Sequence, residues 1–346
     1  MRNPEKILVI QTAFLGDVVL SLPIVQVLKK RFMNAKVDFM CIPATSKLLE
    51  GNQYISEVII YDKRNSAQRF RGMFDIAKRL KKENYNIVIS PHRSYRTSII
   101  VRLIKPDLSI GFNISGLSFL YSERVEYLQY EHEIIRNLSL LTPLNIFIDD
   151  IVKPELFPSQ VHKRKVDEIF LIHELSYIDK IVAVAPGSAW FTKRYPREKF
   201  LNILKKLSDD GIKTVLVGGS DDTELKNYFD MWKPERTINL IGELSILETT
   251  ELLKRCSILL TNDSAPLHIA NSVGTDVIAL FGATIPQFGF YPYGDNDFIF
   301  ETNGLKCRPC SLHGGNVCKI KTFDCMNKID ELKIYFKIKE KLAGLD

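Results

Sequence analysis

Short apolar runs alternate with longer amphipathic stretches along almost the whole chain. In the first half the pattern predicts strands at residues 7–10, 37–42, 58–61 and 87–90, with helices that end near residues 31, 83, 104 and 141. The second half repeats the pattern, with strands at residues 181–185, 213–217, 256–260 and 277–281 and helices at 160–175, 197–209, 221–232, 246–255 and 266–273. Such alternation is typical of parallel sheets covered by helices. The sequence therefore predicts an α/β fold with two doubly wound domains that face one another.

A proline-rich stretch near the middle of the chain predicts the domain boundary. Prolines stand at residues 143, 154 and 158, which is typical of a connector. We expect an N-terminal domain at residues 1–158, a C-terminal domain at 159–328 and a C-terminal helix at 329–346, with the N-terminal domain as a candidate packing partner for that helix. Because proline is tolerated mainly in the first turn of a helix, Pro23 is expected near the start of the first helix.

The composition is that of a globular chain. The 346 residues are 45% hydrophobic and 25% charged, and no stretch reaches the roughly 20 apolar residues of a membrane-spanning helix. The first residues, MRNPEKILVIQ, lead almost at once into a strand, so no signal peptide is predicted and a cytoplasmic protein is expected. A net charge of +6 fits an anionic substrate or an anionic membrane surface.

The strongest group of polar residues follows the strand at residues 256–260. The sequence TNDSAPLHIA, residues 261–270, places Asp263 and Ser264 at the start of a helix and His268 one turn inside it. Ligands of open α/β sheets bind at the carboxyl ends of the strands, and the free N–H groups of a helix start suit a phosphate. The alternative is a plain helix cap with a solvated histidine, since Asp and Ser are favoured caps.

A basic loop follows the strand at residues 181–185. It contains Gly187 and Ser188, then Lys193 and Arg194. A small-residue turn followed by two cations can hold a diphosphate through N–H groups and charge, whereas the alternative is a solvated basic loop. Its place at the same sheet edge as Asp263 favours binding. Gly218 and Gly219 with Asp221 give a weaker signal of a third loop at this edge.

The first domain has candidate loops at corresponding positions. Gly16 and Asp17 follow the first strand, where the glycine permits close approach of a substrate and the carboxylate either caps the helix or accepts a proton from a sugar hydroxyl. Arg93 and Arg96 follow the fourth strand and either grip a carboxylate or phosphate of an acceptor or lie on the surface. The dinucleotide fingerprint G-x-G-x-x-G does not follow the first strand. The motif G-x4-G-K-[ST] does not occur either, and its absence argues against a P-loop nucleotide hydrolase.

Four of the six cysteines lie close together near the end of the chain. Cys307, Cys310, Cys318 and Cys325 form the pattern C-x2-C-x7-C-x6-C inside a cysteine-rich segment, residues 303–326. Without an export signal this pattern favours a metal or redox site over disulfides, and its spacing permits a closed tetrahedral site for one structural zinc ion. Reduced free thiols and an iron–sulfur cluster are the alternatives, and His313 is a fifth candidate ligand.

The order and spacing of these segments resemble the ADP-heptose:lipopolysaccharide heptosyltransferases, glycosyltransferase family nine, in a heptosyltransferase II-like form. The resemblance covers almost the whole chain and rests on KILVIQTAFLGDVVL at residues 6–20, RSYR at 93–96, HE and RN within 132–137, TNDSAPLH at 261–268 and LFGAT at 280–284. It implies the GT-B architecture, in which two Rossmann-like domains face one another across a cleft that holds the active site. It also implies transfer of L-glycero-D-manno-heptose from ADP-heptose to the inner core of lipopolysaccharide, with inversion and without a catalytic metal.

The resemblance also assigns roles to single residues. Asp17 matches the proposed general base, Lys193 the lysine on the donor phosphates and Ser188 a hydroxyl beside them. Asp263, Ser264 and His268 match the D-[ST]-x-x-x-H loop around the diphosphate sugar. The remaining donor-binding candidates are Gly187, Leu244 at the adenine position and Ala265, which stands where the family often has glycine; the acceptor-binding candidates are Gly16, Arg93 and Arg96.

The expected partners are ADP-heptose and the anionic inner core of lipopolysaccharide, with no nucleic acid and no catalytic cofactor. Peripheral association would place the protein at the inner face of the cytoplasmic membrane. Two alternatives stay open: a transferase of the same architecture for another nucleotide sugar, and a sugar-nucleotide-binding protein without turnover. Asp17 in its Gly-Asp context argues against the second.

Overall fold

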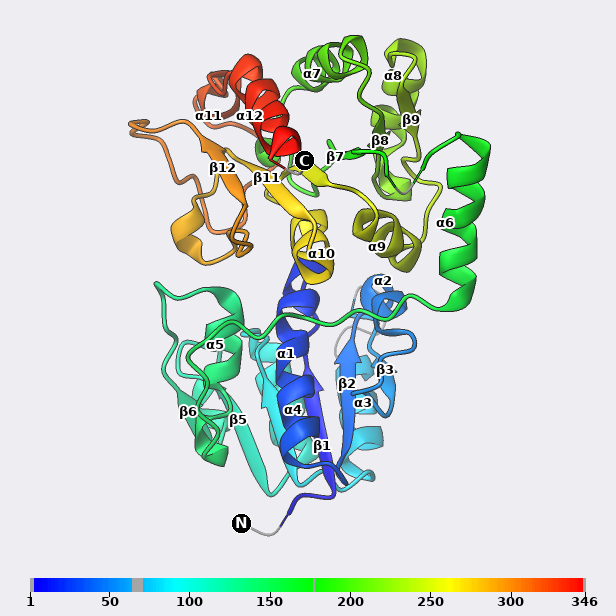
Figure 1. Ribbon diagram of the computed structural model, residues 1–346. Coiled ribbons are helices and arrows are strands. Elements are labelled where there is room, and N and C mark those ends of the chain that lie inside the picture. The colour runs from blue at the N-terminus through cyan, green and yellow to red at the C-terminus, as the bar shows by residue number, and fades with distance from the viewer. Residues whose placement is uncertain (1–2, 64–70, 177, 345–346) are drawn as a thin grey trace. The chain divides into compact units, whose positions relative to one another are not determined.

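The computed structural model describes residues 3–63, 71–176 and 178–344 (Figure 1). The chain divides into two compact units, Met1–Phe157 and Pro158–Asp346, here named the N-terminal and the C-terminal unit. Each unit is a parallel six-stranded sheet covered by helices, so the predicted α/β class with two doubly wound sheets is confirmed. No helix in the described part of the chain is long and apolar enough to cross a membrane.

The sheet of the N-terminal unit has the strand order β3-β2-β1-β4-β5-β6. Its strands are β1 (Lys6–Ile10), β2 (Lys36–Cys41), β3 (Val58–Ile60), β4 (Ile87–Ser90), β5 (Leu108–Phe112) and β6 (Glu123–Val125). The central strands read as continuous apolar runs because both faces of the sheet are covered. The chain builds from β1 outward to β3 and then places β4 on the other side of β1, so the strand order reverses between β1 and β4.

Helices pack in two layers on this sheet. They are α1 (Leu15–Arg31), α2 (Pro43–Ser46), α3 (Arg71–Lys81), α4 (Tyr95–Ile104) and α5 (Glu133–Ser139), with single 3-10 turns at Lys47–Leu49, Ser118–Leu120 and Thr142–Leu144. Helices α3 and α4 pack on each other over the side chains of Leu8, Ile10 and Val88. Helix α1 packs against α5.

Pro23 lies in the interior of α1, so the prediction that it starts this helix is wrong. Helix α1 begins earlier than expected, at Leu15. A proline inside a helix removes one hydrogen bond and costs about 3 kcal/mol. Residues 18–26 on both sides of Pro23 are buried, and this packing outweighs the lost bond.

The C-terminal unit repeats the architecture with the strand order β12-β11-β10-β7-β8-β9. Its strands are β7 (Val182–Ala185), β8 (Thr214–Leu216), β9 (Thr237–Asn239), β10 (Ile258–Asn262), β11 (Asp276–Phe281) and β12 (Phe298–Glu301). Here the strand order reverses between β7 and β10. Alternate residues of neighbouring strands, such as Val184, Leu260 and Ile278, face one core beneath the helices.

The helices of this unit are α6 (Gln160–Ile172), α7 (Arg197–Asp209), α8 (Thr223–Trp232), α9 (Ile246–Lys254), α10 (Ala265–Val273), α11 (Asp324–Asn327) and α12 (Glu331–Ala343), with 3-10 turns at Phe191–Lys193, Ser220–Asp222 and Pro286–Phe288. Helix α12 lies beside α7 (Figure 1) and buries Ile334 and Ile338 in the core of this unit. On the other side, α9 packs against both α6 and α10.

Four strands were missed by the sequence pattern. Three of them, β6, β9 and β12, are the outermost strands of their sheets, and each has only three or four residues, which is too short for a clear alternating or apolar pattern. The fourth, β5, has the sequence LSIGF, in which Ser109 and Gly111 interrupt the apolar run.

Candidate active site

The polar residues of the C-terminal unit gather where β7 and β10 end. Asn262, the last residue of β10, connects the two strand ends: its side-chain nitrogen donates to the Pro186 carbonyl at 2.8 Å, and its side-chain oxygen accepts from the Tyr195 N–H at 3.0 Å. This is the point at which the strand order reverses, and open α/β sheets bind their ligands there.

Lys193 and Asp263 form a nearly buried ion pair at this edge. The Lys193 Nζ lies 2.6 Å from Oδ2 of Asp263, and the side chains are 13% and 7% exposed. The Thr284 hydroxyl donates to the same oxygen at 2.6 Å. Because an ammonium has three N–H donors, Asp263 can fix the direction of Lys193 while other donors remain for an anion.

Ser264 and His268 lie close by, and neither matches the alternative interpretation of a plain helix cap with a solvated histidine. Ser264 holds the N-cap position of α10, yet its side chain does not cap the helix, and its hydroxyl donates to the Asn262 carbonyl at 3.3 Å. His268 is 3% exposed, with its ring 6.4 Å from that of Phe290. The structure therefore shows neither a plain cap nor a solvated histidine.

The loop after β7 is held in shape by a cation and a carboxylate. Arg194 Nε donates to the Ser188 carbonyl at 2.8 Å, so the second cation of the basic loop braces its small-residue turn. A Cβ on Gly187 would lie only 2.6 Å from Oδ2 of Asp222, so a larger residue at this position would displace the Asp222 carboxylate. Burial raises the pKa of Asp222, while the Gly219 N–H and Arg194 lower it.

The remaining donor candidates are at helix starts. Ala265 is the first residue of α10, and Leu244 is half-buried directly before the N-cap of α9, Ser245. Asp222 was not predicted as a site residue, since the Gly-Gly turn directed attention to Asp221 instead.

In the N-terminal unit, a histidine bridges the ends of β1 and α4 at the strand reversal. His92 Nδ1 lies 3.0 Å from the Thr12 hydroxyl and 2.7 Å from the Thr97 hydroxyl. Burial, with the charges of Lys63 and Arg93, lowers the pKa of His92 to about 3. The ring is therefore neutral at physiological pH and serves as a hydrogen-bonding centre rather than as a cation.

Asp17 lies in the first turn of α1, directly after Gly16, and is half-buried. Phe14 holds the N-cap position, so Asp17 is not the cap. A carboxylate in the first turn is stabilised by the helix dipole. Helix α1 packs against α5, and the negative charge of Asp17 raises the pKa of Glu133, the first residue of α5. The structure thus brings these two carboxylates near one another.

Glu133 belongs to a buried cluster that the sequence did not identify as a site. Arg136 is fully buried and its Nη1 lies 2.9 Å from Glu133 Oε2 and contacts the Tyr127 hydroxyl. Burial raises the pKa of Glu133 to about 7, aided by Asp17 and opposed by Arg136 and Arg93. Two signals were available: the spacing E-x-x-R in an apolar helix, which puts both side chains on one face, and the HE and RN motifs that contributed to the family resemblance without being assigned a role.

Arg93 joins this cluster and Arg96 does not. The guanidinium of Arg93 lies 4.6 Å from the ring centre of Tyr127, and that of Arg136 lies 4.8 Å from it. Arg96 instead donates to the Tyr95 hydroxyl at 3.3 Å. The two acceptor candidates thus have different surroundings, and only Arg93 is oriented by an aromatic ring shared with a buried ion pair.

The four clustered cysteines do not form the closed cage that their spacing predicts. Within the described ranges no three His, Cys, Asp or Glu side chains are grouped so that they could hold one metal ion. Cys307 and Cys310 are exposed, whereas Cys325 is buried in the core of the C-terminal unit. Burial raises the pKa of the Cys325 thiol to about 11, and the three other cysteines add to the effect, so the thiols are neighbours without sharing a centre.

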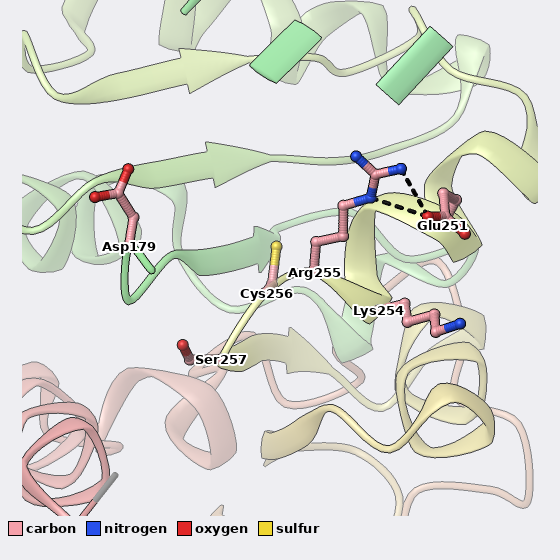
Figure 2. Close-up of a pocket in the computed structure, with 6 residues that line it drawn as sticks. All are labelled: Asp179, Glu251, Lys254, Arg255, Cys256 and Ser257. Carbon is pink, nitrogen blue, oxygen red and sulfur yellow. Dashed lines mark hydrogen bonds and ion pairs between the residues drawn. The ribbon is translucent and has the colours of Figure 1, made fainter. Parts of the chain in front are cut away.

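A pocket of about 430 Å³ lies away from these edges (Figure 2). Its lining includes Ser257 and Arg255, which precede β10 and so lie at the amino end of the strand. Arg255 is neutralised by Glu251 at 2.8 Å and Asp167 at 2.6 Å. The two cations of the lining, Arg255 and Lys254, are matched in number by its two carboxylates, Asp179 and Glu251, so the pocket has no excess of positive charge for an anionic substrate.

Comparison with known proteins covers nearly the whole chain. Residues 73–319 match the family described as glycosyltransferase family 9 (heptosyltransferase). The lipopolysaccharide heptosyltransferase 3 of Escherichia coli is 26% identical over 307 residues, which cover 86% of this chain and 88% of the relative.

Two solved structures show the same fold. The glycosyltransferase family 9 protein of Veillonella parvula has a TM-score of 0.87 at 22% identity, with 98% of both chains covered. The E. coli ADP-heptose lipopolysaccharide heptosyltransferase II has a TM-score of 0.79 at 20% identity, with 98% of this chain and 99% of that chain covered. These likenesses confirm the predicted GT-B fold.

Proposed function

Because the chain belongs to glycosyltransferase family 9, the heptosyltransferases, we propose that it transfers L-glycero-D-manno-heptose from ADP-heptose to the inner core of a lipopolysaccharide. The observation that carries the proposal is the Lys193–Asp263 ion pair at the strand reversal of the C-terminal unit. Its fixed ammonium, beside the glycine turn after β7 and the start of α10, suits a diphosphate. The E. coli relative named as an ADP-heptose heptosyltransferase supports ADP-heptose as the donor.

In this proposal the C-terminal unit binds the donor. Lys193 takes a diphosphate oxygen, Ser188 and the N–H groups at Gly187, Ser264 and Ala265 lie around the diphosphate, and His268 lies beside the sugar. Leu244 meets the adenine with its backbone. As the donor bond breaks, negative charge grows on the diphosphate, and each well-aimed donor offsets it by roughly 3–4 kcal/mol in the transition state.

The N-terminal unit binds the acceptor and supplies the base. Asp17 accepts the proton of an acceptor hydroxyl while that oxygen attacks the anomeric carbon from the face opposite ADP. The bond from the anomeric carbon to the diphosphate oxygen breaks with its electron pair on ADP, so the configuration inverts. Gly16 leaves room for the acceptor beside the backbone, and Arg93 and Arg96 pair with anionic groups of the inner core.

The acceptor suggests a location for the protein, and the four cysteines separately suggest a structural ion. An inner core is carried by a lipid, so we propose peripheral association with the inner face of the cytoplasmic membrane, supported by the net charge of +6. We keep a structural zinc ion on the four cysteines as part of the proposal. It is supported by their spacing in the sequence, requires thiols that are not grouped around one centre in the described structure to come together, and takes no part in the transfer.

The test is a transfer assay with purified protein, synthetic ADP-heptose and inner-core acceptors that carry no heptose, one heptose or two. Mass spectrometry of the product and equimolar ADP release are expected with one of these acceptors, and NMR of the new linkage is expected to show inverted configuration. ADP-glucose and UDP-glucose serve as competing donors. Transfer from one of these in preference to ADP-heptose, or binding of ADP-heptose with no product from any acceptor, would replace the proposal by one of the two alternatives.

A further inference from the structure

The cysteine-rich segment is built onto the loop that carries Lys193. Thr192 and Gly315 exchange two hydrogen bonds: the Thr192 N–H donates to the Gly315 carbonyl at 2.9 Å, and the Gly315 N–H donates to the Thr192 hydroxyl at 2.8 Å. A Cβ on Gly314 would lie 3.0 Å from Cγ of Lys193, and the φ of Gly314 is +84°. The segment therefore supports the stem of the lysine directly.

The same segment holds the turn on the other side of the ion pair through Arg308. Its guanidinium donates to the carbonyls of Gly282 at 2.6 Å and of Thr284 at 2.7 Å. These residues belong to the turn that follows β11. The Cys310 N–H adds a third bond to this turn, to the Ala283 carbonyl at 2.8 Å.

Arg308 is itself fixed from the far side. It pairs with the Glu301 carboxylate at 2.7 Å and donates to the Thr302 carbonyl at 3.2 Å, and its side chain is 6% exposed. The planar guanidinium thus connects the end of β12 to the turn after β11. An ammonium has fewer donors and no fork, so lysine cannot reproduce this set of bonds.

We propose that Arg308 is a positioning residue for donor binding, acting through Thr284 and Asp263 on Lys193. Arg308 fixes the backbone of Thr284, the Thr284 hydroxyl donates to Asp263 at 2.6 Å, and Asp263 holds Lys193 at 2.6 Å. Each link is a hydrogen bond or ion pair between groups that are largely buried. Because water does not replace these bonds, a displacement of Arg308 should also displace Thr284, Asp263 and Lys193. This inference rests on the proposed role of Lys193 as the ligand of the donor diphosphate.

The relay makes a prediction that a merely structural role does not. If Arg308 only stabilised the fold, its loss would lower the melting temperature and the fraction of active enzyme, with unchanged affinity in the folded molecules. If it positions Lys193, the donor KM and the ADP dissociation constant rise while the acceptor KM stays constant. Thr284→Val removes the middle link alone, since the valine keeps the backbone carbonyl that Arg308 binds.

The experiment measures ADP binding by calorimetry, and both KM values, for the wild type, Arg308→Lys, Thr284→Val and the double variant. Arg197→Lys is the matched control, because Arg197 forms exposed ion pairs with Glu198 and Glu224 on α7 and α8 of the same unit. We expect Arg308→Lys and Thr284→Val each to weaken ADP binding about tenfold, and the control to bind ADP as the wild type does. The double variant should bind ADP no less tightly than the single variant with the lower affinity, because the effects of residues in one relay are not additive.

Three results would overturn the inference alone: wild-type ADP affinity in folded Arg308→Lys, wild-type ADP affinity in Thr284→Val, or additive losses in the double variant. Thermal melts establish that each variant is folded, and Thr284→Val tests the relay if Arg308→Lys does not fold, because wild-type ADP affinity in Thr284→Val also contradicts it. Failure of the wild type itself to bind ADP overturns the proposed function together with the relay.

Discussion

The ammonium of Lys193 lies 2.6 Å from the carboxylate of Asp263, which joins the loop after β7 to the loop after β10. Removal of one partner from a buried pair leaves the other charge uncompensated. The two residues therefore act as one unit, and in the proposed donor site Asp263 orients the cation while Lys193 meets the anion. This coupling would account for a carboxylate beside a diphosphate, which it would otherwise repel.

Lys193→Ala is expected to weaken ADP binding by about tenfold or more, because a charge-assisted contact is lost. The effect should exceed that of Lys205→Ala, an exposed lysine of α7 that serves as the control. Calorimetric titration with ADP measures it. Equal affinities of the two variants would remove Lys193 from the donor site.

Asp17→Asn is expected to fold and to bind ADP-heptose normally but to lose about 10²–10⁴-fold in kcat, the usual contribution of a general base. The amide keeps the size of the side chain and removes only its basicity. Asp75→Asn, an exposed position on α3, is the matched control. Turnover near that of the wild type at saturating acceptor would show that Asp17 is not the base.

Much of the fold followed from the sequence because central strands of parallel sheets are buried on both faces. β4 and α7 have the bounds that the pattern predicts, since Ile87–Ser90 begins with three apolar residues and is buried throughout, and Arg197–Asp209 has helical spacing. The outer strand β6, with the sequence ERV, carries no such signal. Pro23 shows the opposite failure, in which packing along α1 outweighs a local rule.

The candidate site followed from the sequence only where polar residues lie in the loop that follows a predicted strand. Asp263 and Lys193 were found in this way, but their pairing with each other and with Thr284 depends on three loops meeting in space. Tyr127, Glu133 and Arg136 lie beyond β6, a strand that the pattern missed, so the strand pattern did not place them beside Arg93, although Glu133 and Arg136 belong to motifs of the family resemblance. Arg308 was not identified from the sequence because its proposed role depends on hydrogen bonds to backbone carbonyls, which every residue type has.

Tyr127→Leu is expected to raise the acceptor KM several-fold, because Arg93 loses the ring 4.6 Å away that orients its guanidinium; such contacts contribute about 0.5–2 kcal/mol. Tyr127→Phe keeps the ring and should stay close to the wild type in acceptor KM, although it loses the hydroxyl contact with Arg136. Steady-state kinetics with acceptor varied at saturating ADP-heptose measures both. A larger rise for the phenylalanine variant than for the leucine variant contradicts this role of the ring.

Glu133 predicts a pH dependence of stability. Burial raises the pKa of Glu133 from 4.5 to about 7 in the folded protein, so between these values the native state holds a proton that the unfolded chain has released. The contribution of this group to stability is therefore largest below about pH 4.5 and falls as the pH rises towards 7. Urea unfolding at pH 5.0 and 7.5 should show a smaller pH difference for Glu133→Gln than for the wild type. An unchanged difference would mean that Glu133 is ionised throughout this range.

The last prediction concerns the four cysteines. Backbone N–H groups of residues 320–323 surround the Cys318 sulfur and lower its pKa, which favours the thiolate that zinc binds, whereas burial raises the pKa of Cys325, whose proton zinc would have to displace. A bound ion would tie the exposed Cys307 and Cys310 to the buried Cys325 and would stabilise a segment that has few apolar residues of its own. We expect about one zinc ion per chain in protein purified without chelator.

Because Gly315 and Arg308 connect this segment to Lys193 and Asp263, removal of the zinc should also weaken ADP binding and lower the melting temperature. Cys318→Ser should reproduce both effects, whereas Cys256→Ser, in a cysteine outside the segment, should retain the metal. Less than about 0.2 equivalents of any transition metal, with four freely titratable thiols in the native protein, contradicts the zinc assignment.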